Sequence, residues 1–499
     1  MWLQVPKLNN CASGILTFCI RGLKSFSSIP GPKTLPVVGT LYQYLPIVGN
    51  YKFKELHHNG LKKYQKYGPV VKEELVPGVT ILWLFDPQDI EMMYRCEGKY
   101  PQRRSHLALE KFRLDRPNVY NTGGLLPTNG PDWLRIRKAF QKGLSGPRAV
   151  KNFLDGSDEI INEWLEERVE VVRKKPTTDF LPELSRLFLE LTGYAVLDLR
   201  LRTFSRAELN KYSTSTKLIN ATFKANSCIL KLDNGPQLWR KFNTPMYKRL
   251  KRSQLYMEEV AIDLLSLKMS IFSDNNINQH LTLLQQYFAC PDVDFQDIIG
   301  TVCDFLLAGI DTTSYTTSFL LYHLGKSPSV QLALFEEVIK LLPEKQSPVT
   351  EEVLNQAHYA KATLKELFRL RPISVGVGRV LNESAVFSEY EVPKDTVVVS
   401  QNQISCRLDK YFACPHEFKP ERWLKNHPLY ENKHPFLVLP FGHGPRACIA
   451  RHLAEQNILV VLLKLVRRYK IEWNGSVLDS KSLLINAPDG PISLRFDAR

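Results

Sequence analysis

The chain has 499 residues, 44% of them apolar, which is enough to build a large buried core. Length alone favours about three domains of roughly 150 residues, but no internal repeat or linker divides the chain after about residue 50, so we expect one large domain. The net charge of +15 favours an acidic partner or an anionic membrane surface. The basic residues follow no zinc-finger, basic-zipper or RNA-recognition pattern, so nucleic-acid binding is not expected. A basic surface without a specific partner is the alternative.

Nine cysteines are spread thinly over the chain. Their number is odd, and no CxxC or Cys/His spacing indicates a zinc site. This usage predicts reduced thiols in a protein that is not secreted. Most of them are expected to be buried as small apolar side chains.

The N-terminal segment is basic and rich in hydroxyl groups, and the first acidic residue of the chain is Glu55. This composition is typical of a mitochondrial presequence, which we assign to residues 1–28. The longest apolar stretch, 15–20, is far shorter than the ~20 residues needed to span a bilayer, so no anchoring helix is expected. A short secretory signal is the alternative. Prolines and glycines in 29–50 predict a stiff lead-in, with the compact domain covering 51–499.

The predicted elements follow in chain order. The β-branched segments 70–76 and 79–85, separated by Pro77-Gly78, predict a hairpin. Helical periodicity dominates from about 131 to 270. Residues 294–325 are too apolar on all sides for a surface helix and predict a helix through the core. Helices are then expected at 328–342, 350–357 and 358–370, short strands near 378–381, 385–390 and 396–400, and a last helix at 449–468. The fold class is therefore mainly α with a small β portion.

The segment 441–450, with the sequence FGHGPRACIA, carries the strongest chemical signal. Gly442 and Gly444 permit tight turns and a close approach to a flat ligand. Arg446 can reach an anionic group. Cys448 precedes a helix, whose N-terminal N–H groups favour thiolate over thiol. The alternative is a chance turn before a helix with a buried cysteine.

This segment resembles the haem-ligand loop of the cytochrome P-450 family, Phe-x-x-Gly-x-Arg-x-Cys-x-Gly, with Ala450 in place of the last glycine. The resemblance covers about residues 30–495. It implies the cytochrome P-450 fold, with haem b between the long central helix and the helix after the cysteine loop. Cys448 would be the thiolate ligand of the iron, and Phe441, Gly444 and Arg446 would also bind the haem.

Three residues outside the loop resemble haem-propionate ligands of the family. Trp133 and Arg137 lie four residues apart on a helix that starts at Gly130-Pro131. Arg379 follows the extended segment 372–378. The alternative for each residue is plain surface placement.

A charged network is implied by two further segments. Glu366 and Arg369 are spaced i, i+3 on one helix. Arg422, in the sequence Pro-Glu-Arg-Trp, resembles the family's second arginine for the same carboxylate. The three residues would order the chain beneath the haem. An ordinary surface helix pair is the alternative.

The central helix contains the sequence AGIDTT at 308–313. Gly309 inside a helix costs about 1 kcal/mol relative to alanine, which indicates a functional distortion. Asp311 and Thr312 resemble the family's oxygen-activating acid–alcohol pair and are the candidate catalytic residues, while Gly309 would open a groove over the iron. The alternative is that Thr312 bonds to the carbonyl of residue 308 and Asp311 pairs with an arginine.

Two features are similar to the mitochondrial class of the family: the leader without an anchor, and basic residues at its docking positions for an acidic ferredoxin. These positions are Lys361, Lys365 and Arg451. The positive net charge suits such docking. The class implies a protein peripherally associated with the mitochondrial inner membrane. A solvated charged face is the alternative.

The segment 448–456, CIARHLAEQ, resembles the insect ecdysteroid 22-hydroxylases within this class. The resemblance implies a haem-thiolate monooxygenase that uses dioxygen to hydroxylate a sterol, at the C22 side-chain position of an ecdysone precursor. Another mitochondrial sterol hydroxylase, a haem-thiolate isomerase or dehydratase, and a non-enzymatic haem carrier or gas sensor are the alternatives. The family positions for the substrate pocket are 101–126, Ala308 and 373–377.

Overall fold

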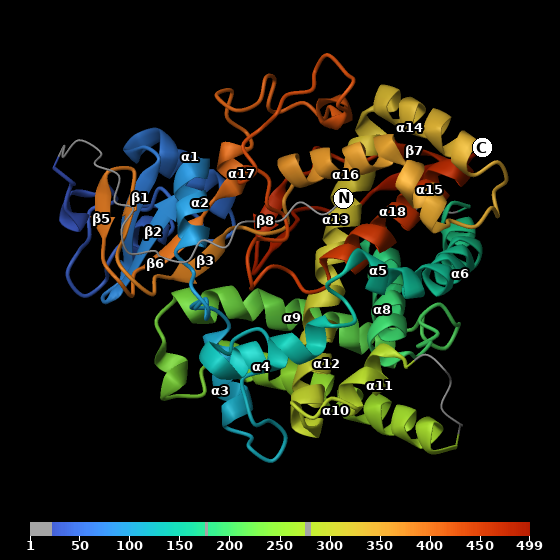
Figure 1. The fold of residues 1–499 in the computed structure, drawn as a ribbon, viewed down its shortest axis with the longest axis horizontal. Helices are drawn as coiled ribbons and strands as arrows, with labels where there is room; N and C mark the ends of the chain where they lie inside the picture. Colours follow the sequence, from blue (N-terminus) through green and yellow to red (C-terminus); the bar gives the residue numbers. More distant parts are fainter. Residues whose placement is uncertain (1–21, 175–177, 275–280) are drawn as a thin grey trace, which may run out of the picture.

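The computed structural model describes residues 22–174, 178–274 and 281–499 (Figure 1). As predicted, these residues form a mainly helical fold with a small β portion. In those three ranges no helix combines the length and the apolar character needed to cross a bilayer.

The helices occupy most of the chain. In chain order the α-helices are α1 (Leu56–Tyr67), α2 (Pro87–Arg95), α3 (Leu107–Leu114), α4 (Gly130–Gln141), α5 (Pro147–Val150), α6 (Leu154–Trp164), α7 (Glu170–Val172), α8 (Leu181–Leu197), α9 (Thr214–Asn234), α10 (Pro245–Asp274), α11 (Leu283–Phe288), α12 (Phe295–Gly309), α13 (Asp311–Lys326), α14 (Pro328–Leu341), α15 (Glu351–Gln356), α16 (His358–Leu370), α17 (Asn402–Ser405) and α18 (Arg451–Arg468). Short 3-10 segments are η1 (Phe26–Ser28), η2 (Leu41–Tyr44), η3 (Lys151–Phe153), η5 (Leu238–Arg240) and η6 (Pro420–Trp423), and a π turn is η4 (Leu165–Val169).

The strands form one four-stranded sheet and three strand pairs. They are β1 (Val70–Val76), β2 (Val79–Leu84), β3 (Val377–Val380), β4 (Ala385–Phe387), β5 (Tyr390–Val392), β6 (Val397–Ser400), β7 (Tyr469–Trp473), β8 (Ser480–Ser482), β9 (Asn486–Pro488) and β10 (Leu494–Ala498). The large sheet has the order β1-β2-β6-β3 and confirms the predicted hairpin, with β6 parallel to β2. The strand expected at 385–390 is instead two strands, because Ser388 and Glu389 have positive φ angles and form the turn between them.

The predicted central helix is present as two helices, α12 and α13, which run through the middle of the molecule (Figure 1). Helix α12 begins with a capping box formed by Asp294 and Asp297. The interruption falls at Ile310. The hydroxyls of Thr312, Thr313 and Ser314 donate to carbonyls four residues earlier, a competition that distorts helices.

The N-terminal region packs more tightly onto the fold than the sequence suggests. Most of the predicted presequence, residues 1–21, lies outside the described residues, but Lys24 already pairs with Tyr390 of β5. In the lead-in, Ile29 and Tyr44 are buried, so the folded domain extends N-terminal to the expected start at Tyr51. The predicted stiff segment 29–50 is therefore part of the core around the sheet.

Glu73 on β1 fixes this lead-in. Its buried carboxylate forms an ion pair with Lys63 and accepts hydrogen bonds from Thr40 and Tyr44 of the lead-in and from Trp83 of β2. A buried ion pair with extra hydrogen bonds is stable only while both partners are present.

We expect Glu73→Ala to lower the free energy of unfolding by about 3–5 kcal/mol, because it leaves the buried Lys63 ammonium without a partner. Urea unfolding at pH 7 measures the change. Glu391→Ala, at an exposed position on β5, serves as the control and should change stability by less than about 0.5 kcal/mol. Equal unfolding midpoints for the two variants would contradict the prediction.

Candidate functional site

The cysteine loop is held by backbone and aromatic contacts. Gly442 and Gly444 have φ angles of +70° and +74°, and a Cβ on Gly444 would come within 2.6 Å of the Glu97 carboxylate. The loop closes through a 2.9 Å hydrogen bond from the Cys448 N–H to the carbonyl of Phe441. The Phe441 ring packs edge-on against Phe368 of α16. The sulfur-bearing residue therefore occupies a fixed position.

The electrostatics of Cys448 differ from the expectation. Although the residue is accessible to solvent, protein encloses its sulfur closely enough for desolvation to raise the pKa of the thiol above its ordinary value. The Ala450 N–H and the Arg137 guanidinium oppose this effect. Helix α18 begins at Arg451 with Ala450 as its N-cap residue, so a backbone N–H at the helix start favours the thiolate as predicted, but desolvation outweighs this effect. A coordinated metal cation can deprotonate such a thiol outright.

Four arginines gather beside this loop. Arg446 is buried and bonds to the carbonyls of Pro101 and Thr128, and its guanidinium lies 4.1 Å from the ring centre of buried Trp133. Arg379 is paired with Glu97 at 2.8 Å. The others are Arg103 and Arg137. The sequence predicted Trp133, Arg137, Arg379 and Arg446 as neighbours of one ligand, and the structure brings them together.

The cluster carries more positive charge than its surroundings neutralise. Burial and the neighbouring guanidinium groups lower the pKa of Arg446 to about 8 and that of Arg103 to about 10. The Nη1 atom of Arg446 and the Nε atom of Arg103 are buried without a hydrogen-bond partner. Unpaired buried donors of this kind are costly unless an acceptor meets them. The cluster therefore fits a ligand that carries carboxylates.

Asp311 occupies the first position of α13, next to the helix interruption. It is 1% exposed, and its Oδ2 atom accepts a 2.7 Å hydrogen bond from Asn226 of α9, while Oδ1 has no partner. Burial raises the pKa of Asp311 to about 7, against the opposing hydrogen bonds from Asn226 and the Thr312 N–H. Thr312 donates to the Ala308 carbonyl at 2.6 Å. An acid that changes protonation near neutral pH thus lies beside a hydroxyl group.

The neighbours of this segment differ from one stated alternative and add a packing contact. A Cβ on Gly309 would lie 2.8 Å from the hydroxyl of Thr192 on α8, so this glycine permits close packing of the two helices. Asp311 has Asn226 as its partner rather than an arginine. The predicted bond from Thr312 to the carbonyl of residue 308 is present.

The charged network of α16 is fully formed. Glu366 and Arg369 are both 0% exposed and make two hydrogen bonds, at 2.7 and 2.9 Å. Arg422 and Trp423 of η6 donate to the same carboxylate. Arg369 also donates to the carbonyls of residues 406, 415 and 417. The network fixes the irregular chain that precedes the cysteine loop.

The three basic residues predicted to dock a partner lie at the surface or close to it. Lys361 donates to the Asn355 carbonyl, and burial lowers its pKa. Lys365 is exposed, with its ammonium 5.3 Å from the Trp423 ring centre. Arg451 is exposed and forms an ion pair with Glu455, so its charge is partly neutralised.

Known proteins resemble the whole chain. The sequence matches the cytochrome P450 family over residues 29–494. Three relatives come from Drosophila melanogaster. "Cytochrome P450 302a1, mitochondrial" is 46% identical, over 98% of both chains. "Probable cytochrome P450 301a1, mitochondrial" is 29% identical, over 94% of this chain and 87% of its own. "Ecdysone 20-monooxygenase" is 28% identical, over 96% of this chain and 90% of its own.

The chain therefore belongs to the cytochrome P450 family and is a haem-thiolate monooxygenase of that family. Members of this family bind haem iron through a cysteine thiolate. A sulfur on a rigid loop beside buried guanidinium groups is a donor set that fits both the iron and the carboxylates of haem.

Sequence reasoning missed several residues of the site. For Arg103 the sequence contains only a weak indication of a site, namely the two consecutive arginines 103 and 104 shortly after Pro101. Trp423 ends the Pro-Glu-Arg-Trp segment, but nothing in the sequence assigned its indole N–H to Glu366. Asn226 and Glu97 gave no signal, because their partners come from distant parts of the chain.

The raised pKa of Asp311 predicts a stability change in Asp311→Asn. The folded protein holds a proton that the unfolded chain, with a pKa near 3.9, releases, so this residue's contribution to stability falls as pH rises from about 4 to about 7. Asn removes the titration. We expect the free energy of unfolding of Asp311→Asn, relative to that of the unmodified protein, to be about 2–3 kcal/mol larger at pH 8 than at pH 5. Urea unfolding at both pH values measures it, and Asp409→Asn, at an exposed position, should show no such difference.

Proposed function

We propose that this monooxygenase hydroxylates a sterol, at the C22 side-chain position of an ecdysone precursor, using dioxygen and electrons from an acidic ferredoxin. The observation that carries the proposal is the placement of Cys448 beside a buried arginine cluster, with the acid–alcohol pair of Asp311 and Thr312 at a helix interruption. The resemblance of 448–456 to ecdysteroid 22-hydroxylases supports the substrate class. Another mitochondrial sterol hydroxylase is the second candidate.

Haem b is held, in this proposal, by Cys448 through its iron and by the arginine cluster through its carboxylates. The residues assigned to it are Trp133, Arg137, Arg379, Phe441, Gly444, Arg446 and Cys448, to which we add Arg103. When bound, haem supplies the chemistry of dioxygen activation, while the protein supplies position and electrostatics. Charge-assisted hydrogen bonds from the unpartnered Arg103 and Arg446 donors would orient its carboxylates.

Asp311 and Thr312 would handle protons. An acid whose pKa lies near 7 can donate and regain a proton at the pH of the cell. Asn226 holds one carboxylate oxygen of Asp311 and leaves the other, Oδ1, without a partner. The Thr312 hydroxyl, now donating to Ala308, can accept a hydrogen bond in return. A haem-thiolate isomerase or dehydratase would need no such proton path.

The ferredoxin would dock on the basic residues of α16, Lys361 and Lys365, with Arg451 as a third contact. Exposed charges of this kind accelerate association and select an acidic partner. The relative with 46% identity carries "mitochondrial" in its name, which supports the same compartment here, with peripheral association at the inner membrane. The predicted presequence would direct this import.

Removing one guanidinium from the arginine cluster should weaken haem retention. Arg103→Ala deletes a charge-assisted hydrogen bond of about 1.5–3 kcal/mol, so we expect haem loss to accelerate roughly 10- to 100-fold. Transfer of haem to excess apomyoglobin, followed by absorbance, measures the rate. The neighbouring Arg104 donates to the Asp233 carbonyl, so Arg104→Ala is the control. Identical rates for both variants would remove Arg103 from the haem site.

Turnover with purified components tests the function itself. The haem-loaded protein, with ferredoxin, its reductase and a panel of ecdysteroid precursors, should yield a hydroxylated sterol only when ferredoxin is present. Lys361→Gln/Lys365→Gln should raise the KM for ferredoxin roughly tenfold, since exposed charge pairs contribute about 0.5–1 kcal/mol each. The matched control, Lys217→Gln/Lys224→Gln, lies on α9, across the central helices from α16 (Figure 1). No product from any sterol refutes the substrate class, and a rearranged or dehydrated product formed without ferredoxin favours the isomerase or dehydratase alternative.

A further inference from the structure

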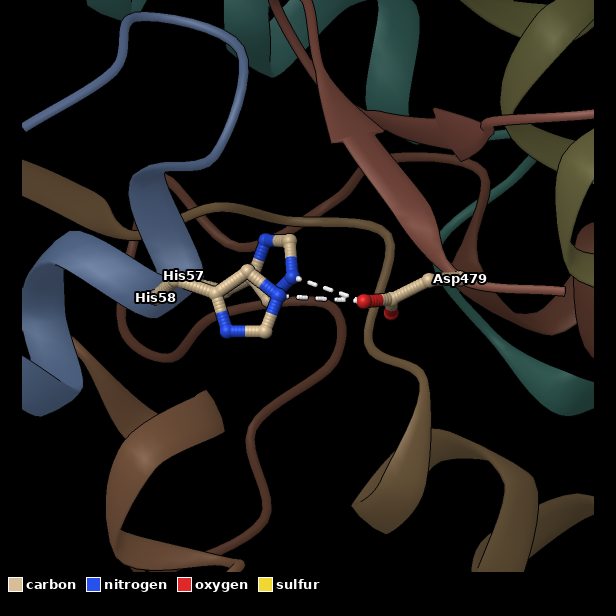
Figure 2. Close-up of side chains that lie close together, drawn as sticks. All are labelled: His57, His58 and Asp479. Carbon is tan, nitrogen blue, oxygen red and sulfur yellow. Dashed lines mark hydrogen bonds and ion pairs between the residues drawn. The ribbon is translucent and has the colours of Figure 1, made fainter. Parts of the chain in front are cut away.

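A second group of metal-ligand side chains lies where helix α1 meets strand β8. His57 and His58 occupy the first turn of α1, and Asp479 immediately precedes β8. Figure 2 shows both imidazole rings directed at the same carboxylate. The Nε2 atoms of His58 and His57 lie 3.1 and 3.6 Å from Oδ2 of Asp479.

His57 is buried, and its one polar contact among the described residues is the 3.6 Å approach to Asp479, which is longer than a hydrogen bond. It is 3% exposed, and neither ring nitrogen has a hydrogen-bond partner. Leaving a buried polar group unsatisfied costs about 1–3 kcal/mol. His58 and Asp479 are partly exposed, so the group remains open to solvent on one side. A cation between the rings and the carboxylate would satisfy His57.

We propose that His57, His58 and Asp479 bind a divalent metal ion with the ligand preferences of Zn²⁺. Two ligands at 2.0–2.1 Å from zinc in tetrahedral geometry lie about 3.3 Å apart, and the two observed separations, 3.1 and 3.6 Å, bracket this value. Two imidazoles and one carboxylate favour Zn²⁺ over Mg²⁺ and Ca²⁺, which prefer all-oxygen sites. Solvent supplies the fourth ligand.

Arg371 completes the surroundings of the site. Its Nη1 atom lies 2.6 Å from Oδ1 of Asp479, which leaves Oδ2 facing the histidines. A residue that bonds to a metal ligand from outside the coordination shell, as Arg371 does to Asp479, fixes the orientation of that ligand.

The metal would join two parts of the fold that already touch. The Leu56 N–H donates to the hydroxyl of Ser482, and the Ser482 N–H donates to the Lys54 carbonyl. Beyond Ser482, Leu484 packs against the core cluster that contains α12. Metal binding would thus strengthen the attachment of the β8–β9 hairpin to α1.

Calorimetric titration of the haem-loaded protein at pH 7.5 tests the proposal, with ZnCl₂ and with MgCl₂ as separate probes. We expect one saturable equivalent of Zn²⁺, no Mg²⁺ binding, and a higher midpoint of thermal unfolding with Zn²⁺. Since losing even an outer partner of a ligand weakens binding about 10–100-fold, His58→Ala and Asp479→Asn should each weaken it by more than about 100-fold.

His416→Ala, at an exposed histidine outside the cluster, should bind Zn²⁺ as the unmodified protein does. His58 is itself partly exposed, so its replacement should not unfold the protein. The proposal is refuted if no saturable Zn²⁺ binding occurs, or if His58→Ala and Asp479→Asn both bind as tightly as the unmodified protein.

Discussion

The protein depends on concentrating buried positive charge next to a single sulfur. Burial and the neighbouring guanidinium groups lower the pKa of Arg446 and of Arg103, and the Glu97 carboxylate is bonded to only one arginine of the cluster, Arg379. Such a cluster is unfavourable on its own. Its members come from segments far apart in the chain, so the charges meet only when the whole domain has folded. The tertiary structure as a whole, and no single local segment, therefore offsets the free-energy cost of bringing these charges together.

A buried carboxyl group, that of Asp311, and an interrupted helix form the second part of the site. Hydroxyl groups of α13 that donate back to the carbonyls of Ala308 and Ile310 weaken the regular helical pattern at Ile310. This local distortion places Asp311 at the start of a new helix, where Asn226 of α9 reaches it. The surrounding apolar core keeps its regular packing.

The fold class and most elements could be predicted, since they depend on local patterns. The hairpin at β1 and β2 follows from β-branched residues around a Pro-Gly turn, and the boundaries of α16 follow from periodicity and Pro372. The exact contacts could not be predicted. Asn226 meets Asp311, and Gly309 meets Thr192, only because separate helices pack together. The Cys448 loop was identifiable because all its specified residues lie within ten positions.

In the haem site proposed above, the arginine cluster would also couple folding of the protein to the supply of haem. A ligand that binds only the folded state stabilises it in proportion to the logarithm of its concentration. Carboxylates that relieve four crowded guanidinium groups bind the folded state alone, because the unfolded chain has no cluster. Chains that fold while haem is scarce would spend more time open to proteases. The abundance of the enzyme in a cell is therefore expected to follow haem availability, even at a constant rate of synthesis.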